Sequence, residues 1–127
     1  MLLGHGSRDP LWQEPFHRLK AMLESMAPNM AVRLAYLEII EPTLEKTVVA
    51  LAEEGIAEAH IVPVFFGQGG HVRRDIPAHL ERLSARFPEI QLYCSQAVGE
   101  NDDVLNAIAA YCLAQTNHAP NQGLAKQ

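Results

Sequence analysis

Residues 59–79 read AHIVPVFFGQGGHVRRDIPAH, and this stretch decides the fold. It opens on a nearly continuous apolar run, 59–66, which is typical of a parallel strand buried on both faces. Three glycines end the run, and Asp75 then offers a side chain that commonly caps the start of a helix. Pro77 suits the first turn of that helix, so His71 is expected in the turn before it. The stretch therefore predicts a strand–turn–helix unit with a histidine at the turn.

The same alternation of strand and helix runs through the whole chain. Strand-like apolar runs lie at 1–3, 31–37, 59–66 and 90–95. Apolar residues recur at helical spacing within 16–26, 43–54, 75–87 and 102–112. This order predicts an α/β fold, a flavodoxin-like open parallel four-stranded sheet in the order 2-1-3-4 with helices on both faces. The first strand is short for the central position that this order gives it.

Several residues are typical of helix ends and support these boundaries. Pro42 and Thr43 suit the start of the second helix, and Gly55 suits its end. Asn101 or Asp102 is expected to cap the last helix. We expect that helix to turn three apolar residues inward: Leu105, Ile108 and Cys112.

The composition is that of an ordinary globular protein. Its 127 residues suit one domain, expected at 1–115, followed by a polar tail, 116–127, that we expect to be disordered. A net charge of −5 without a basic block argues against nucleic acid, and no apolar stretch approaches the roughly 18 residues that cross a membrane. No secretory signal pattern opens the chain, so Cys94 and Cys112 are expected to be reduced, buried residues of a cytoplasmic protein.

Polar residues follow three of the predicted strands where each strand ends. His5 lies in GHGSRDP (4–10) after the first strand, Glu38 follows the second, and His71 follows the third. Ligands in such sheets bind beyond the carboxyl ends of the strands, at the switch point between strands 1 and 3. Two imidazoles and a carboxylate at one edge suit a borderline divalent metal such as Co, Ni, Fe or Zn.

Other chemistries fit these loops less well, although each candidate taken alone also fits a solvated loop residue. GHGSR is not G-x-S-x-G, no Lys-Ser/Thr follows the glycines at 67–70, and no G-x-G-x-x-G follows the first strand. Flavin binding would rest on fold alone. A Ser7 nucleophile with His71 as its base lacks an identifiable orienting acid. The remaining histidines are expected at surface or structural positions: His17, His60, His79 and His118.

Three motifs in this order resemble those of the CbiX/SirB sirohydrochlorin chelatases. They are GHGSRDP at 4–10, YLEIIEPTL at 36–44 and VPVFFGQGGHVRRDIP at 62–77, within a resemblance that covers about 2–112. The resemblance implies a flavodoxin-like chelatase half that inserts Co²⁺, Fe²⁺ or Ni²⁺ into sirohydrochlorin, in cobalamin or sirohaem biosynthesis. Longer relatives carry two such halves in one chain. A single half therefore implies a homodimer with the cleft between its subunits.

The resemblance also implies roles for particular residues. His5 and His71 correspond to catalytic metal ligands, with Glu38 as a further ligand, and the metal is a substrate rather than a permanently bound cofactor. A carboxylate-rich tetrapyrrole needs local positive charge and backbone donors in a protein of charge −5. We expect the substrate to contact Ser7, Arg8, Gly69, Gly70, Arg73 and Arg74. A non-catalytic metal or tetrapyrrole carrier is the alternative, and it differs from a chelatase in having no turnover.

Overall fold

The structure, a computed structural model, describes residues 1–67 and 69–117, apart from the side chain of His71. Within these residues the strands are β1 (Leu2–Gly4), β2 (Leu34–Tyr36), β3 (Glu58–Pro63) and β4 (Gln91–Cys94). The α-helices are α1 (Glu14–Met26), α2 (Leu44–Glu53), α3 (Gly70–Arg86) and α4 (Asp102–Thr116). Two short 3₁₀ turns, η1 (Pro10–Gln13) and η2 (Val98–Glu100), precede α1 and α4.

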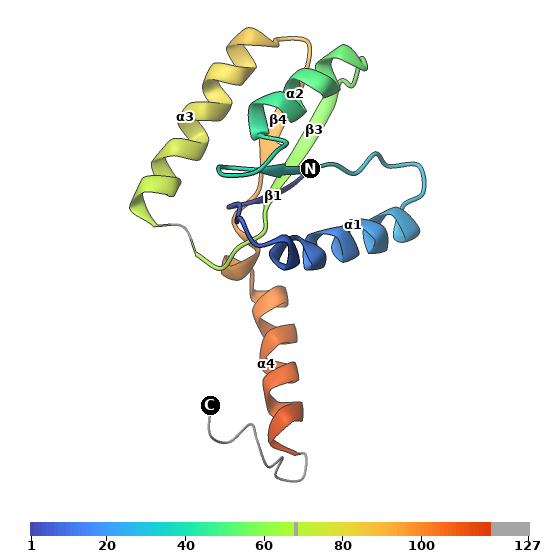
Figure 1. Cartoon of the computed structure of the whole chain (residues 1–127), viewed down its shortest axis with the longest axis vertical. Coiled ribbons are helices and arrows are strands. Elements are labelled where there is room, and N and C mark those ends of the chain that lie inside the picture. The colour runs from blue at the N-terminus through green and yellow to red at the C-terminus, as the bar shows by residue number, and fades with distance from the viewer. Residues whose placement is uncertain (68, 118–127) are drawn as a thin grey trace.

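The strands form one parallel sheet in the order β2-β1-β3-β4, with helices on both sides (Figure 1), which confirms the predicted fold class. The central strand β1 has only three residues, but hydrogen bonds lengthen its pairing at both ends. The amino group of Met1 donates to the carbonyl of His60 at 2.7 Å, and the amide of Val64 donates to the carbonyl of Leu3 at 2.7 Å. The short strand therefore still holds β2 and β3 together.

The main core lies between the sheet and the helices α2 and α3. It consists of buried aliphatic side chains, among them Leu3, Val48, Leu51, Ile61, Ile76 and Leu83. On the opposite face, Phe16 of α1 and Trp12 of η1 pack against Tyr36 of β2. Gly55 and Asn101 stand at helix ends as predicted: Gly55 has a φ of +76°, and Asn101 accepts the amide hydrogen of Val104. The start of α2 differs slightly, because Thr43 caps the helix and Pro42 lies before it rather than at its first position.

The start of α3 differs from the prediction. The helix begins at Gly70 after the extended Gly69, so Asp75 is not an N-cap and His71 lies in the first turn rather than in a preceding loop. Pro77 lies inside the helix, where it removes one backbone donor. Pro77 is exposed on the surface of α3, so its ring does not disturb the core. An Asp-x-Pro pattern is thus compatible with a helix that began earlier.

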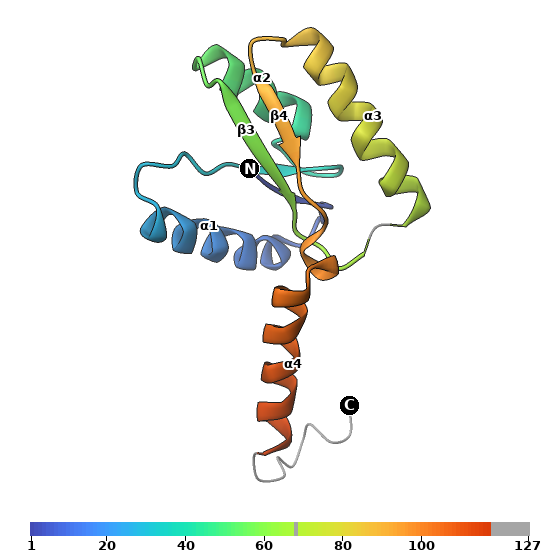
Figure 2. The same cartoon turned by 180° about the vertical axis from the view of Figure 1, so that it is seen from behind.

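The uncovered half of the sheet corrects two further predictions. Along β3, Ala59 and Ile61 are buried but Glu58 and His60 are exposed, so the strand is buried on one face only. Helix α4 points away from the sheet (Figures 1 and 2) and has no buried residue, so its apolar residues do not face inward. Cys94 and Cys112 are both free cysteines, but both are exposed rather than buried.

Two predictions on the ends of the domain and on membranes have partial outcomes. Thr116 is the last residue of α4, and the predicted tail lies outside the described residues after Asn117, together with His118. None of the helices in the described part of the chain is both long and apolar enough to cross a membrane.

Tyr36 generates a stability prediction, because it is 1% exposed and its hydroxyl has no hydrogen-bond partner among the described residues. We expect Tyr36→Phe to raise the free energy of unfolding by about 1 kcal/mol at pH 7, since the variant buries no unpaired hydroxyl. Burial raises the pKa of the Tyr36 hydroxyl. The contribution of the protonated Tyr36 hydroxyl to the free energy of unfolding is therefore fully present below about pH 10 and is lost as the pH rises through the folded-state pKa. The difference in free energy of unfolding between the Tyr36→Phe variant and the wild type should widen in this pH range.

Urea unfolding followed by circular dichroism at pH 7 and at alkaline pH measures both effects. Tyr93→Phe is the matched control, because Tyr93 is 47% exposed and its hydroxyl reaches water. A destabilised Tyr36→Phe variant would show that the hydroxyl has a partner after all.

Candidate functional site

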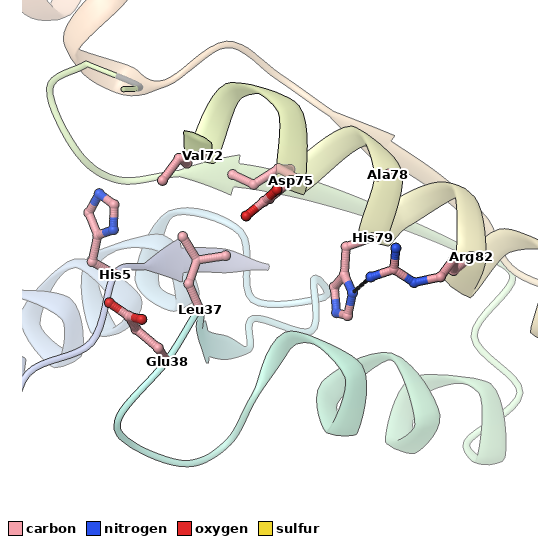
Figure 3. Close-up of a pocket in the computed structure, with 9 residues that line it drawn as sticks. His5, Leu37, Glu38, Val72, Asp75, Ala78, His79 and Arg82 are labelled. Atoms are coloured by element: carbon pink, nitrogen blue, oxygen red, sulfur yellow. Dashed lines mark hydrogen bonds between the residues drawn. The ribbon is translucent and has the colours of Figure 1, made fainter. Parts of the chain in front are cut away.

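A cavity of about 420 Å³ opens where the loops after β1 and β2 face α3 (Figure 3). Its polar wall residues are His5, Glu38, Asp75, His79 and Arg82. Its apolar wall includes Leu37, Val72 and Ile76. The cavity thus lies at the carboxyl edge of the sheet, next to the switch point between β1 and β3 where ligands of such folds bind.

The imidazole of His5 follows β1 in the chain and packs against the loop after β3. His5 follows directly after Gly4, the last residue of β1, and is half-buried. Its ring packs against Phe65, in the loop after β3, with ring centroids 4.3 Å apart and planes tilted by 35°. This contact restricts the ring while one side of it still faces the cavity.

Backbone hydrogen bonds bring Glu38 beside His5. The ladder of β1 and β2 ends with the amide of Leu37, which donates to the carbonyl of Gly4 at 2.9 Å. The next amide, that of Glu38, donates to the carbonyl of His5 at 3.0 Å and joins the two loops directly. The amide of Ile40 then donates to the carbonyl of Glu38 at 2.8 Å around Ile39, whose φ is +75°. This is a strained three-residue turn for a β-branched residue, and such strain concentrates at functional sites.

Gly6 is required by the same contact. Its φ is +110°, and a β-carbon at this position would lie 1.9 Å from the carbonyl oxygen of Glu38. Both the backbone conformation and the space therefore exclude any side chain here.

The second acid of this loop, Glu41, is already paired. Lys46 Nζ donates to its carboxylate at 2.9 Å, and this hydrogen bond lowers the pKa of Glu41. Within the described residues Glu38 has no such ion pair, and it lies on the cavity wall. Of the two carboxylates, Glu38 is therefore the one available to a metal ion.

The predicted set of three ligands is only partly described. His5 and Glu38 line the same cavity. The backbone of His71 lies in the first turn of α3, but its side chain is outside the described residues. Among the side chains that the structure does describe, no three of His, Cys, Asp or Glu gather closely enough to hold a metal ion. His71 as a ligand remains a prediction.

The predicted substrate residues are not among those that line the cavity. Ser7 Oγ accepts the amide hydrogen of Asp9 at 3.2 Å, which leaves its hydroxyl hydrogen available. Arg8 is exposed, and Arg73 and Arg74 are exposed on α3 rather than in a loop. Side chains built at Gly69 and Gly70 would meet nothing within 4 Å, so the space beside them is open.

Three wall residues were missed by the sequence analysis: Asp75, His79 and Arg82. Asp75 was interpreted as a cap and His79 as a surface residue, but both line the cavity. Their spacing of four and then three residues places them with Arg82 on one helix face. This spacing indicates a shared helix face only if the helix is known to begin at Gly70. The Asp-x-Pro pattern instead suggested a start at Asp75.

Comparison with known proteins gives a consistent picture. The model of the CbiX family matches residues 1–112. A sirohydrochlorin cobaltochelatase of Methanopyrus kandleri is 36% identical over 80 residues, which are 63% of this chain and 56% of that protein. A sirohydrochlorin ferrochelatase of Bacillus subtilis is 27% identical over 111 residues, 85% of this chain and 41% of that protein. The chain therefore spans about half the length of these curated relatives.

Solved structures with the same fold include relatives of two lengths. A CbiX protein from Marinobacter aquaeolei VT8 superposes with a TM-score of 0.78 at 30% identity, covering 93% of this chain and 96% of that one. SirB from Bacillus subtilis with Fe³⁺ has a TM-score of 0.74 at 24% identity, covering 94% of this chain and 46% of that one. At that identity, the likeness to SirB is one of fold.

The crowding at Gly6 generates a second prediction. We expect Gly6→Ala to cost about 3 kcal/mol or more of folding stability, because the methyl group collides with the backbone at Glu38. Gly55→Ala is the control: Gly55 has a similar positive φ of +76°, but a β-carbon there meets nothing within 4 Å. It should cost only about 1 kcal/mol, from the backbone conformation alone. Urea unfolding of the two variants measures the difference, and equal costs would contradict the close contact.

Proposed function

This chain belongs to the CbiX family, and on that premise we propose that it is a sirohydrochlorin chelatase, which inserts Co²⁺, Fe²⁺ or Ni²⁺ into a carboxylate-rich tetrapyrrole. The observation that carries the proposal is that His5 and Glu38 line one cavity and are joined by a hydrogen bond between their own backbones. Relatives named cobaltochelatase and ferrochelatase support a product that enters cobalamin or sirohaem biosynthesis.

The proposed chemistry follows from the residue types. Insertion requires that the hydrated ion lose water and that two pyrrole N–H groups lose their protons as the dication enters the ring. His5, as a neutral imidazole, replaces water on the ion, and His71 is proposed to do the same from α3. Glu38 offsets the charge of the ion and is proposed to accept one of the two protons, and an imidazole accepts the other as the ion leaves it for the ring. The metal therefore passes through this site as a substrate.

The third prediction tests the two described ligands. His5→Ala should lower the rate of Co²⁺ insertion into sirohydrochlorin by at least about 100-fold, and Glu38→Gln by about tenfold or more, because each removes a ligand or a proton acceptor. Visible absorbance of the tetrapyrrole measures the rate. The control is His17→Ala, since His17 is exposed on α1, away from the cavity.

Two results would contradict the assignment. A His5→Ala variant with the wild-type rate would remove His5 from the site. A wild-type protein that binds the tetrapyrrole and Co²⁺ but never forms the metal complex would be a carrier rather than a chelatase.

We also propose that the protein is a homodimer in which α4 of each copy covers the bare β3–β4 face of the other. Helix α4 has 15 residues, none of them buried, and it exposes Tyr111 and Leu113 at 67% each. An isolated apolar helix of this length is marginal in water. The open part of the sheet presents Tyr93 stacked on His60, with centroids 4.9 Å apart. Each copy thus has one helix, α4, without a packing surface and one exposed sheet face, β3–β4, without a covering helix. Two copies related by a twofold axis could cover both.

The fourth prediction concerns this assembly. The double variant Tyr111→Asp/Leu113→Asp should be monomeric and lose helical content, because both side chains would meet the partner's sheet. In a monomer, changes at two exposed positions would have little effect. Sedimentation equilibrium and circular dichroism measure the two outcomes, with Asn106→Asp, also on α4, as the control. A monomeric wild-type protein would contradict the proposal.

A further inference from the structure

The end of the cavity farthest from His5 and Glu38 is formed by His79 and Arg82 of α3 (Figure 3). Arg82 Nη2 lies 2.8 Å from His79 Nδ1. A guanidinium group can only donate hydrogen bonds, so Nδ1 is the acceptor and the hydrogen of the neutral ring is on Nε2. The remaining polar atoms of the pair are therefore N–H donors, and this end of the cavity suits an acceptor-rich ligand.

The charge of Arg82 has no carboxylate partner in the described part of the chain. Glu45 of α2 is close enough for Arg82 to affect its pKa, but it accepts its hydrogen bond from Arg86. That bond is the main cause of the lowered pKa of Glu45, to which the charge of Arg82 adds a smaller contribution. Glu45 is thus engaged by Arg86, and within the described residues the hydrogen bond of Arg82 goes to an imidazole. A positive charge of this kind beside a cavity favours an anion.

We propose that His79 and Arg82 form a carboxylate-binding subsite, which receives an acidic side chain of the tetrapyrrole while its ring nitrogens face His5 and Glu38. The inference rests on the proposed function for the identity of the ligand. One carboxylate can accept both an Arg82 N–H and the His79 Nε2–H. In a protein with a net charge of −5, such local donors are needed to hold a polyanionic substrate. The subsite would also set which edge of the macrocycle enters first.

Equilibrium titration with metal-free sirohydrochlorin, followed by absorbance, tests the proposal without turnover. Arg82→Gln should raise the Kd for sirohydrochlorin by about tenfold at low salt, and by less as salt increases. His79→Phe keeps a ring of similar size without the Nε2–H donor and should raise it severalfold. The Kd for Co²⁺ alone should not change in either variant. Arg18→Gln is the matched control, because it makes the same charge change on α1, and Arg18 is exposed there.

The outcomes separate this inference from the proposed function. Unchanged affinity of Arg82→Gln for sirohydrochlorin would overturn the subsite, even if the wild-type protein inserts metal. Weaker binding by Arg82→Gln but not by Arg18→Gln supports it, even if the wild-type protein proves to be a carrier without turnover. No measurable binding of sirohydrochlorin by the wild-type protein would overturn both.

Discussion

The candidate site depends on backbone hydrogen bonds that continue past the ends of β1 and β2. Those strands are only three residues long, and the amide of Leu37 makes the last bond of their ladder. The amide of Glu38 then donates to the carbonyl of His5, so the two loops are joined directly where the strands end. The two candidate ligands are therefore positioned by backbone hydrogen bonds at the edge of the sheet, and Gly6 allows the close approach that this requires.

A second consequence of the architecture is uneven coverage of the sheet. Helices α2 and α3 cover one face, whereas on the other α1 reaches β2 through Phe16 and Tyr36, and α4 leaves the sheet altogether. At the base of α4, Val104 and Ile108 line an apolar crevice of about 220 Å³ together with Phe65. Phe65 also packs on His5. The same aromatic ring therefore borders both the candidate metal ligand and the surface proposed to join two copies.

Sequence patterns were informative where a local rule decides the structure. Alternation of apolar runs and helical periods predicted the four parallel strands and their order, and the cap at Asn101 was recognisable because its side chain satisfies a nearby amide. Burial of β3 on both faces was expected because its run is apolar, but burial of the second face requires that α4 pack against it. Whether α4 does so is decided by contacts outside residues 59–66.

Part of the site was also predictable, because a local rule places the residues that follow parallel strands at one edge of the sheet. His5 and Glu38 follow strands, and strand order alone brings them to one edge. Asp75, His79 and Arg82 became visible only with the true start of α3, because helical spacing has meaning only once the helix boundaries are known. Asp75 and Pro77 satisfied the rule for a helix start, but the helix tolerates both in its interior.

The close contact between Gly6 and Glu38 also limits which changes in loop length the protein can accept. Loops usually accept insertions, since each doubling of loop length costs only about 0.6 kcal/mol of closure entropy. Here a single added residue between Gly4 and Gly6 would move His5 out of step with Glu38 and bring a side chain against the Glu38 carbonyl. At the proposed metal site, exchange of a side chain is therefore compatible with the fold, whereas a change in loop length would disturb these backbone contacts.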